Sequence, residues 1–117
     1  MAGVSGTNDG VGSAALFNYP HGLAVDSHTN IYVADWRNCT IRKMTPGRVV
    51  TTFAGTALLA GSTDGVGSAA RFDHPWGVAV DSTGNVFVTD EYNNTIRKIT
   101  PNAKVSTLAG RAGGPGS

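Results

Sequence analysis

The sequence contains one unit twice. Residues 9–55 and 64–110 align without a gap, and 28 of the 47 aligned positions are identical, among them the segments DGVGSAA, AVDS and TIRK. Repetition at a fixed spacing of this size is typical of solenoids, propellers and other arrays of small units. We therefore expect two similar structural units, residues 1–55 and 56–110, followed by a linker or tag remnant at 111–117.

Composition favours strands over helices. The 117 residues include 16 glycines and five prolines, only 15% are charged, and no long stretch has apolar residues at helical spacing. Each unit instead has four short β-rich segments separated by turn residues, at 22–26, 31–34, 40–44 and 49–53 and again at 77–81, 86–89, 95–99 and 104–108. We expect an all-β fold in which each unit is a four-stranded antiparallel meander.

The shared segment DGVGSAA, at 9–15 and 64–70, is expected to be a loop. Its Asp-Gly pair is a turn signal, its glycines permit positive φ angles, and Ser-Ala-Ala can form one short helical turn. Phe17 and Phe72 follow the segment and are expected to anchor it against an apolar surface. In an up-and-down meander this loop lies at the same end as the turn between the second and third strands.

Each unit resembles an NHL repeat. Residues 20–43 are PHGLAVDSHTNIYVADWRNCTIRK and residues 75–98 are PWGVAVDSTGNVFVTDEYNNTIRK, so the motif positions match in both copies. The DGVGSAA segment resembles an insertion found in a bacterial type of these repeats. The resemblance implies β-propeller blades arranged around a central channel, with the first strand innermost, and NHL propellers most often have six blades.

Two blades cannot close a ring. Adjacent apolar residues in the second strands, such as Tyr32-Val33 and Phe87-Val88, indicate sheets that are buried on both faces. An isolated pair covers only one interface between blades and leaves two apolar faces for association. Because head-to-tail contacts between identical chains can close into a ring, we expect a homo-oligomer, a six-bladed trimer first and an eight-bladed tetramer next.

Differences between the two units cluster in the loops at one end of the meander. Aromatic and arginine side chains at such positions are typical of binding surfaces. The sequence therefore predicts a binding face for a protein, peptide or glycan ligand at that end, made of Tyr19, His21, Trp36, Arg37, His74, Trp76, Glu91 and Tyr92.

Repeated polar residues in the turns have a structural explanation. Asp35 and Asp90, with Asn38 and Asn93, are expected to bond nearby backbone rather than a ligand. Asp26 and Asp81 lie in hairpins that lack the pattern of a calcium loop. Arg42 and Arg97 are expected to bond neighbouring turns.

No catalytic constellation or cofactor motif is recognisable. The net charge of +1 disfavours nucleic acid as a partner, and no run approaches the roughly 18 apolar residues of a membrane span. Cys39 is the only cysteine, and no histidine lies at the sequence spacing of a zinc motif from it. The one metal candidate is His21, which a trimer would place three times around its axis.

These observations predict a non-catalytic propeller scaffold that binds a ligand on its loop face. The alternative is a subunit or fragment of a propeller enzyme of the lyase or lactonase type, with a metal in the central channel. That alternative requires polar side chains pointing inward, whereas the first strands offer mainly Ala, Val and Gly.

Overall fold

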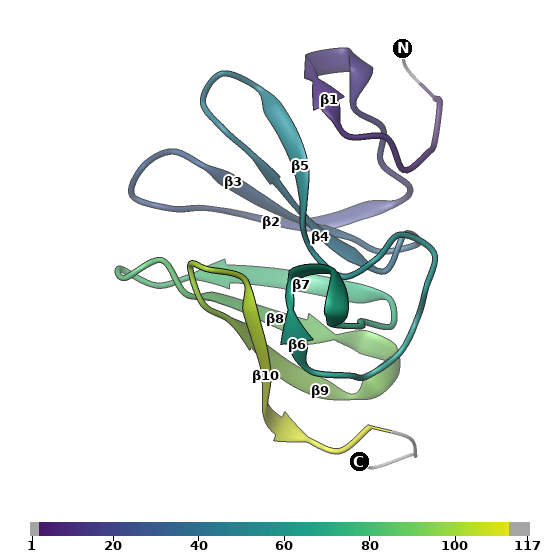
Figure 1. Cartoon of the computed structure of the whole chain (residues 1–117), viewed down its shortest axis with the longest axis vertical. Coiled ribbons are helices and arrows are strands. Elements are labelled where there is room, and N and C mark those ends of the chain that lie inside the picture. Colours follow the sequence, from purple (N-terminus) through teal and green to yellow (C-terminus); the bar gives the residue numbers. More distant parts are fainter. Residues whose placement is uncertain (1–2, 113–117) are drawn as a thin grey trace.

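The computed structural model describes residues 3–112 and consists of two five-stranded antiparallel sheets (Figure 1). The first has the order β1-β5-β4-β3-β2, from β1 (Gly10–Val11), β2 (Pro20–Val25), β3 (Ile31–Asp35), β4 (Thr40–Met44) and β5 (Val49–Ala54). The second has the order β6-β10-β9-β8-β7, from β6 (Gly65–Val66), β7 (Pro75–Val80), β8 (Val86–Asp90), β9 (Thr95–Ile99) and β10 (Lys104–Gly110). The all-β prediction is confirmed.

The prediction of four strands per unit is wrong by one. The four expected strands are present, and Gly10 and Val11 add a fifth by pairing with Val50 and Val49 of β5. In the second unit β6 pairs with β10 in the same way. A two-residue strand is too short to show an alternating pattern in the sequence, but its backbone covers part of the open edge of the outer strand.

The segment DGVGSAA also lies at a different end from the one expected. Its partners Val49 and Val50 begin β5, whereas the turn between β3 and β4 lies beside the end of β5. The expected short helical turns are present, as the 3₁₀ turns η1 (Gly12–Ala14) and η2 (Gly67–Ala69). A third, η3 (Glu91–Asn93), forms the turn between β8 and β9.

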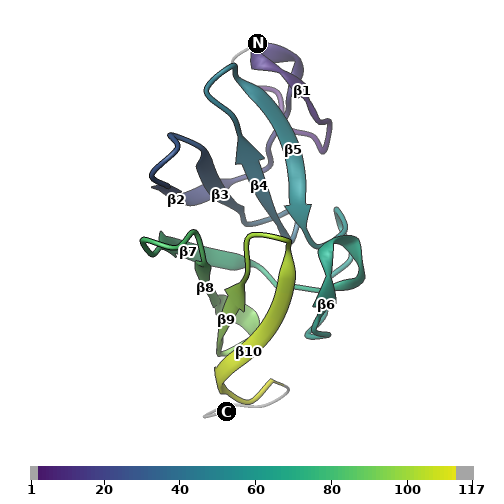
Figure 2. The ribbon, with the colours of Figure 1, turned by 60° about the vertical axis from the view of Figure 1, so that its left-hand side comes forward.

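The two sheets lie face to face, one above the other, as neighbouring propeller blades do (Figures 1 and 2). Their closest approach joins β2 to β7. A Cβ atom at Gly22 would lie 2.8 Å from the carbonyl oxygen of Trp76 and 3.0 Å from the Cα of Gly77. Glycine is therefore required at position 22, because any side chain there would meet the backbone of the second sheet.

The hydrophobic core fills the space between the sheets, which we call the blade joint. It consists of Tyr32, Ala34, Ile41 and Ala54 from the first sheet, Val86, Val88, Ile99 and Val105 from the second, and Ala70 and Phe72 from the segment before β7. Phe72 is fully buried, which confirms the anchoring role expected of it. Its counterpart Phe17 is partly exposed and does not belong to this core.

Both outer faces carry exposed apolar side chains. Leu23 and Val25, 63% and 52% exposed, lie on the outer face of the first sheet, and Ile96 and Leu108, 39% and 52% exposed, belong to β9 and β10 of the second. Among residues 3–112, no helix has the length and apolar character needed to span a membrane. The predicted C-terminal linker falls mainly on residues 113–117, which lie outside the described part of the chain.

Candidate functional site

The eight residues of the predicted binding face lie together at one end of the molecule. Two backbone hydrogen bonds explain why: Trp36 donates its N–H to the carbonyl of Tyr19 at 3.2 Å, and Glu91 donates to the carbonyl of His74 at 3.3 Å. The turn after β3 is thereby tied to the loop before β2, and the turn after β8 to the loop before β7. We call the surface formed by these eight residues the aromatic loop face.

Trp36 is the centre of this face and joins the two sheets. Its ring lies edge-on to His74, at 4.5 Å between centroids, and to Tyr92, at 5.7 Å. Its Nε1–H donates a 2.8 Å hydrogen bond to Oε1 of Glu91. Within the first sheet it also contacts Tyr19 and His21, at 6.4 and 5.9 Å. Such edge-to-face contacts stabilise beyond the area that they bury.

Two stacked pairs complete the face. His21 lies flat on Trp76 with 3.7 Å between ring centroids, and His74 lies flat on Tyr92 at 4.0 Å. The Arg37 guanidinium lies over the ring of Tyr19, 5.1 Å from its centroid. Tyr19, Trp76 and Tyr92 are each about half exposed or more. The arrangement can therefore offer flat ring surfaces and polar ring edges to a ligand, and its role in binding stays a prediction.

Behind this face, each sheet contains a buried ion pair. Asp35 accepts hydrogen bonds from Nδ2 of Asn38 at 2.7 Å and from the Arg42 guanidinium at 3.0 Å, and its other oxygen accepts the backbone N–H of Asn18 at 2.8 Å. Arg42 also donates to the carbonyls of Leu16 and Asn8. The structural role predicted for these turn residues is confirmed.

The second sheet repeats this network with Asp90, Asn93 and Arg97. Burial raises the pKa of Asp35 and of Asp90, and the hydrogen bonds and the paired guanidinium offset part of that rise. Both Arg-Asp pairs are fully buried. Loss of either partner would leave a buried charge without a counter-charge, so the turns at the loop face depend on both.

Sequence reasoning missed the role of Asp9 and Asp64, which it treated as turn residues. Asp9 accepts from the Arg42 guanidinium at 3.0 Å and from Oγ1 of Thr52 at 3.0 Å. Asp64 does the same with Arg97 and Thr107. The signal that could have revealed them is the matching position of Asp and Arg in both repeats. Asp9 thereby ties the short strand β1 to β4 at the centre of its sheet, and Asp64 ties β6 to β9.

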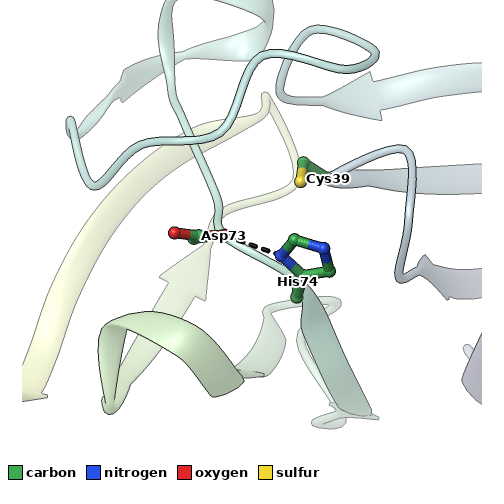
Figure 3. Close-up of side chains that lie close together, drawn as sticks. All are labelled: Cys39, Asp73 and His74. Atoms are coloured by element: carbon green, nitrogen blue, oxygen red, sulfur yellow. Dashed lines mark hydrogen bonds and ion pairs between the residues drawn. The ribbon is translucent and has the colours of Figure 1, made fainter.

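A second cluster of chemically active side chains lies at the blade joint and shares His74 with the aromatic loop face (Figure 3). Cys39, in the turn between β3 and β4, lies close to Asp73 and His74, in the loop before β7. One ligand atom from each residue lies within 4.8 Å of the others. Sequence spacing gave no sign of this cluster, because stacking of the blades joins residues that lie far apart in the sequence.

Three carboxylates act on the thiol of this cluster. Burial raises the pKa of the Cys39 thiol, a backbone hydrogen bond from His74 opposes that effect, and the carboxylates of Asp73, Asp90 and Asp35 raise the pKa further. Nδ1 of His74 is 2.7 Å from Oδ1 of Asp73. Among residues 3–112 this is the only group of three such side chains placed to share a metal ion, so His21 belongs to no such group within the chain.

Comparison with known proteins agrees with the repeat pattern. The NHL repeat family model matches residues 17–44 and 72–99. SUPPRESSOR OF QUENCHING 1, a chloroplastic protein of Arabidopsis thaliana, is 39% identical over 95 residues, which cover 80% of this chain and 9% of that protein. Peptidylglycine alpha-amidating monooxygenase of Rattus norvegicus is 37% identical over 98 residues, covering 81% of this chain and 10% of the enzyme.

Two solved structures from Bacteroides thetaiotaomicron share the fold. A structural genomics protein of unknown function has a TM-score of 0.80 and 29% identity, over 91% of this chain and 26% of that one. An auxiliary nutrient binding protein has a TM-score of 0.74 and 31% identity, over 92% of this chain and 27% of its own. The chain thus spans about a quarter or less of the proteins that it resembles. It belongs with the NHL-repeat proteins, and one NHL repeat lies in each of its two sheets.

Proposed function

We propose that this pair of NHL blades is a non-catalytic binding module and that its ligand binds at the aromatic loop face. The observation that carries the proposal is the continuous contact of six rings, which belong to Tyr19, His21, Trp36, His74, Trp76 and Tyr92. A structural role alone does not require large rings to remain half exposed at the ends of turns. Exposed aromatic clusters are a common feature of binding surfaces.

The chemistry of this face suits a neutral ligand with flat or extended surfaces, such as a glycan or a peptide. It offers one guanidinium, from Arg37, and one carboxylate, from Glu91, which Trp36 already engages. The rings of Trp76 and Tyr92 are 46% and 54% exposed and can stack on sugar rings or peptide groups. The similarity to an auxiliary nutrient binding protein supports a binding role.

Tryptophan fluorescence tests the proposal directly, because both tryptophans of the chain, Trp36 and Trp76, lie in the aromatic loop face. The probes are a panel of soluble oligosaccharides and a panel of unstructured peptides. We expect saturable quenching or a spectral shift with at least one probe, and at least tenfold weaker binding by the Trp76→Ala variant.

The control for this experiment is Leu59→Ser, which changes an exposed apolar side chain in the linker between the sheets. It should bind as the unchanged protein does. Binding that is equally strong in Trp76→Ala, or no response to either panel, would contradict the loop face as the ligand site.

We further propose that the uncovered faces associate with other copies of the chain, in a trimer first and a tetramer next. We expect the contacts between copies to repeat those of the blade joint. Phe72, from the segment before β7, packs beside Gly55, where a Cβ would lie 3.2 Å from the Phe72 ring. The counterpart of Gly55 is Gly110, which lines an open hollow with Thr89, Asn94, Ile96 and Ala109. The ring that would fill it by the same geometry is Phe17 of another copy.

Light scattering coupled to size exclusion tests this assembly. A trimer has a mass of about 36 kDa, three times the 12.0 kDa chain. Phe17→Asp should dissociate it without unfolding the chain, since Phe17 lies outside the blade joint, and Leu59→Ser should leave the mass unchanged. A monomer at 12.0 kDa would contradict the ring and leave the binding proposal standing.

The similarity to an amidating monooxygenase keeps an enzyme segment as the second candidate. On that reading the two blades supply part of a longer catalytic propeller. Turnover in a screen of lyase and lactonase substrates with divalent metals would favour it over the binding module.

A further inference from the structure

We propose that Cys39, Asp73 and His74 form a binding site for a zinc-like divalent metal ion that bridges the two blades. Cys39 comes from the first sheet, and Asp73 and His74 come from the second, so one ion would hold both sides of the blade joint (Figure 3). Thiolate, imidazole and carboxylate are ligands that zinc accepts together, whereas magnesium and calcium prefer oxygen ligands alone. Three protein ligands leave a fourth position for water.

The three ligand atoms lie near the spacing that such a site needs. Zinc binds sulfur at about 2.3 Å and nitrogen at about 2.0 Å, so in a tetrahedral site two such ligand atoms lie roughly 3.5 Å apart. The three atoms lie within 4.8 Å of one another, and side-chain rotations would have to bring them together around the ion. An ion bound to both Asp73 and His74 would replace the hydrogen bond that now joins them at 2.7 Å.

Cys39 gains little from its position unless it has such a partner. Its backbone is left-handed, with φ of 60°, a conformation that favours Asn or Gly over other residues. The second repeat has Asn94 there, with φ of 57°. The thiol donates to the carbonyl of Arg37 at 4.0 Å, a weak interaction for a buried group, and its other hydrogen-bond partner is the backbone of His74 across the blade joint.

All three residues differ from their counterparts in the other repeat, and this supports a role specific to the joint. Asn94, Asn18 and Tyr19 stand where the site has Cys39, Asp73 and His74. The site remains reachable from solvent, because the side chains of His74 and Asp73 are 22% and 29% exposed. The Asp73 carboxylate near the thiol favours a cation there, whereas Asp35 and Asp90 already pair with Arg42 and Arg97.

Cobalt spectroscopy tests the proposal on the full chain, with the thiol kept reduced. Co²⁺ should bind with one equivalent, giving the near-ultraviolet charge-transfer band of a cobalt–thiolate bond, and Zn²⁺ should displace it. The Cys39→Asn variant should lose this band completely. The variants Asp73→Asn and His74→Tyr, which take the residues of the other repeat, should each weaken Co²⁺ binding at least tenfold.

The repeat also supplies the matched control. The double variant Cys39→Asn with Asn94→Cys moves the cysteine to the equivalent turn, where no such Asp-His pair belongs, and it should give no band. A band of equal strength in this variant, or none in the unchanged protein, would overturn the proposal. Zn²⁺ should also raise the Tm of the unchanged protein but not that of His74→Tyr, a readout that does not depend on the thiolate spectrum.

Discussion

Gly22 faces the backbone of Trp76 so closely that a Cβ atom at position 22 would lie 2.8 Å from the Trp76 carbonyl oxygen. The atoms that it would meet belong to the backbone of β7, which cannot rotate away as a side chain can. The contact therefore sets the spacing of the two sheets at their inner strands. The same spacing brings the loops of the aromatic loop face within reach of one another.

Gly22→Ala should push the sheets apart and lower the free energy of unfolding by about 1–3 kcal/mol, the range of an overpacked core. Gly77→Ala is the matched control, since a Cβ there would meet only Oγ1 of Thr89, at 3.0 Å, on a side chain that can move. Urea unfolding of both variants measures the difference. A Gly77→Ala change as large as that of Gly22→Ala would contradict the close approach of β2 and β7.

Phe72→Ala should be the most damaging aromatic substitution in the isolated chain. Phe72 is fully buried in the blade joint, and removing a buried phenylalanine ring typically costs about 3–5 kcal/mol. Phe17→Ala, at the equivalent position in the first repeat, should cost clearly less in the monomer, because its ring is partly exposed. Thermal unfolding of the two variants at low protein concentration makes the comparison, and equal losses would count against the arrangement of the sheets.

Arg97→Met should destabilise the second sheet strongly. It removes the counter-charge of Asp90, 3.0 Å away and fully buried, and such a change typically costs about 3–5 kcal/mol. Lys98→Met alters the next, partly exposed residue and should change the free energy of unfolding by less than about 0.5 kcal/mol. The result should be nearly independent of salt concentration, because the Arg97–Asp90 pair is buried.

Local patterns predicted the strands well. The segment TIRK with its flanking residues marks β4 and β9 at the bounds expected, whereas β2 and β7 begin two residues earlier than expected, at Pro20 and Pro75. A proline suits the first residue of a strand because it has no N–H to donate. These features depend on residues that are neighbours in the chain, so a single sequence is enough to predict them.

Features that depend on the stacking of the sheets were only partly predictable. The sequence placed Trp36 and His74 at the same end, but not in contact at 4.5 Å, because that distance depends on the angle between the two sheets. It missed the proximity of Cys39 to His74 for the same reason. The strands β1 and β6 were missed because two residues carry no periodic pattern.

Asp81, in the hairpin between β7 and β8, should make the stability of the protein depend on pH in the acid range. Hydrogen bonds from Asn85 and Thr83 lower the pKa of Asp81 to about 2 from its ordinary value of 3.8. Because the folded-state pKa is the lower one, the stabilisation by ionised Asp81 is complete above the ordinary value and is lost as the pH falls toward 2. Carboxyl NMR should give a titration midpoint near 2, and Asn85→Ala should raise it toward 3.8. The variant Asp81→Asn has no charge to lose, so its stability should fall less steeply over this interval. A midpoint that stays the same in Asn85→Ala would show that these hydrogen bonds are not the cause.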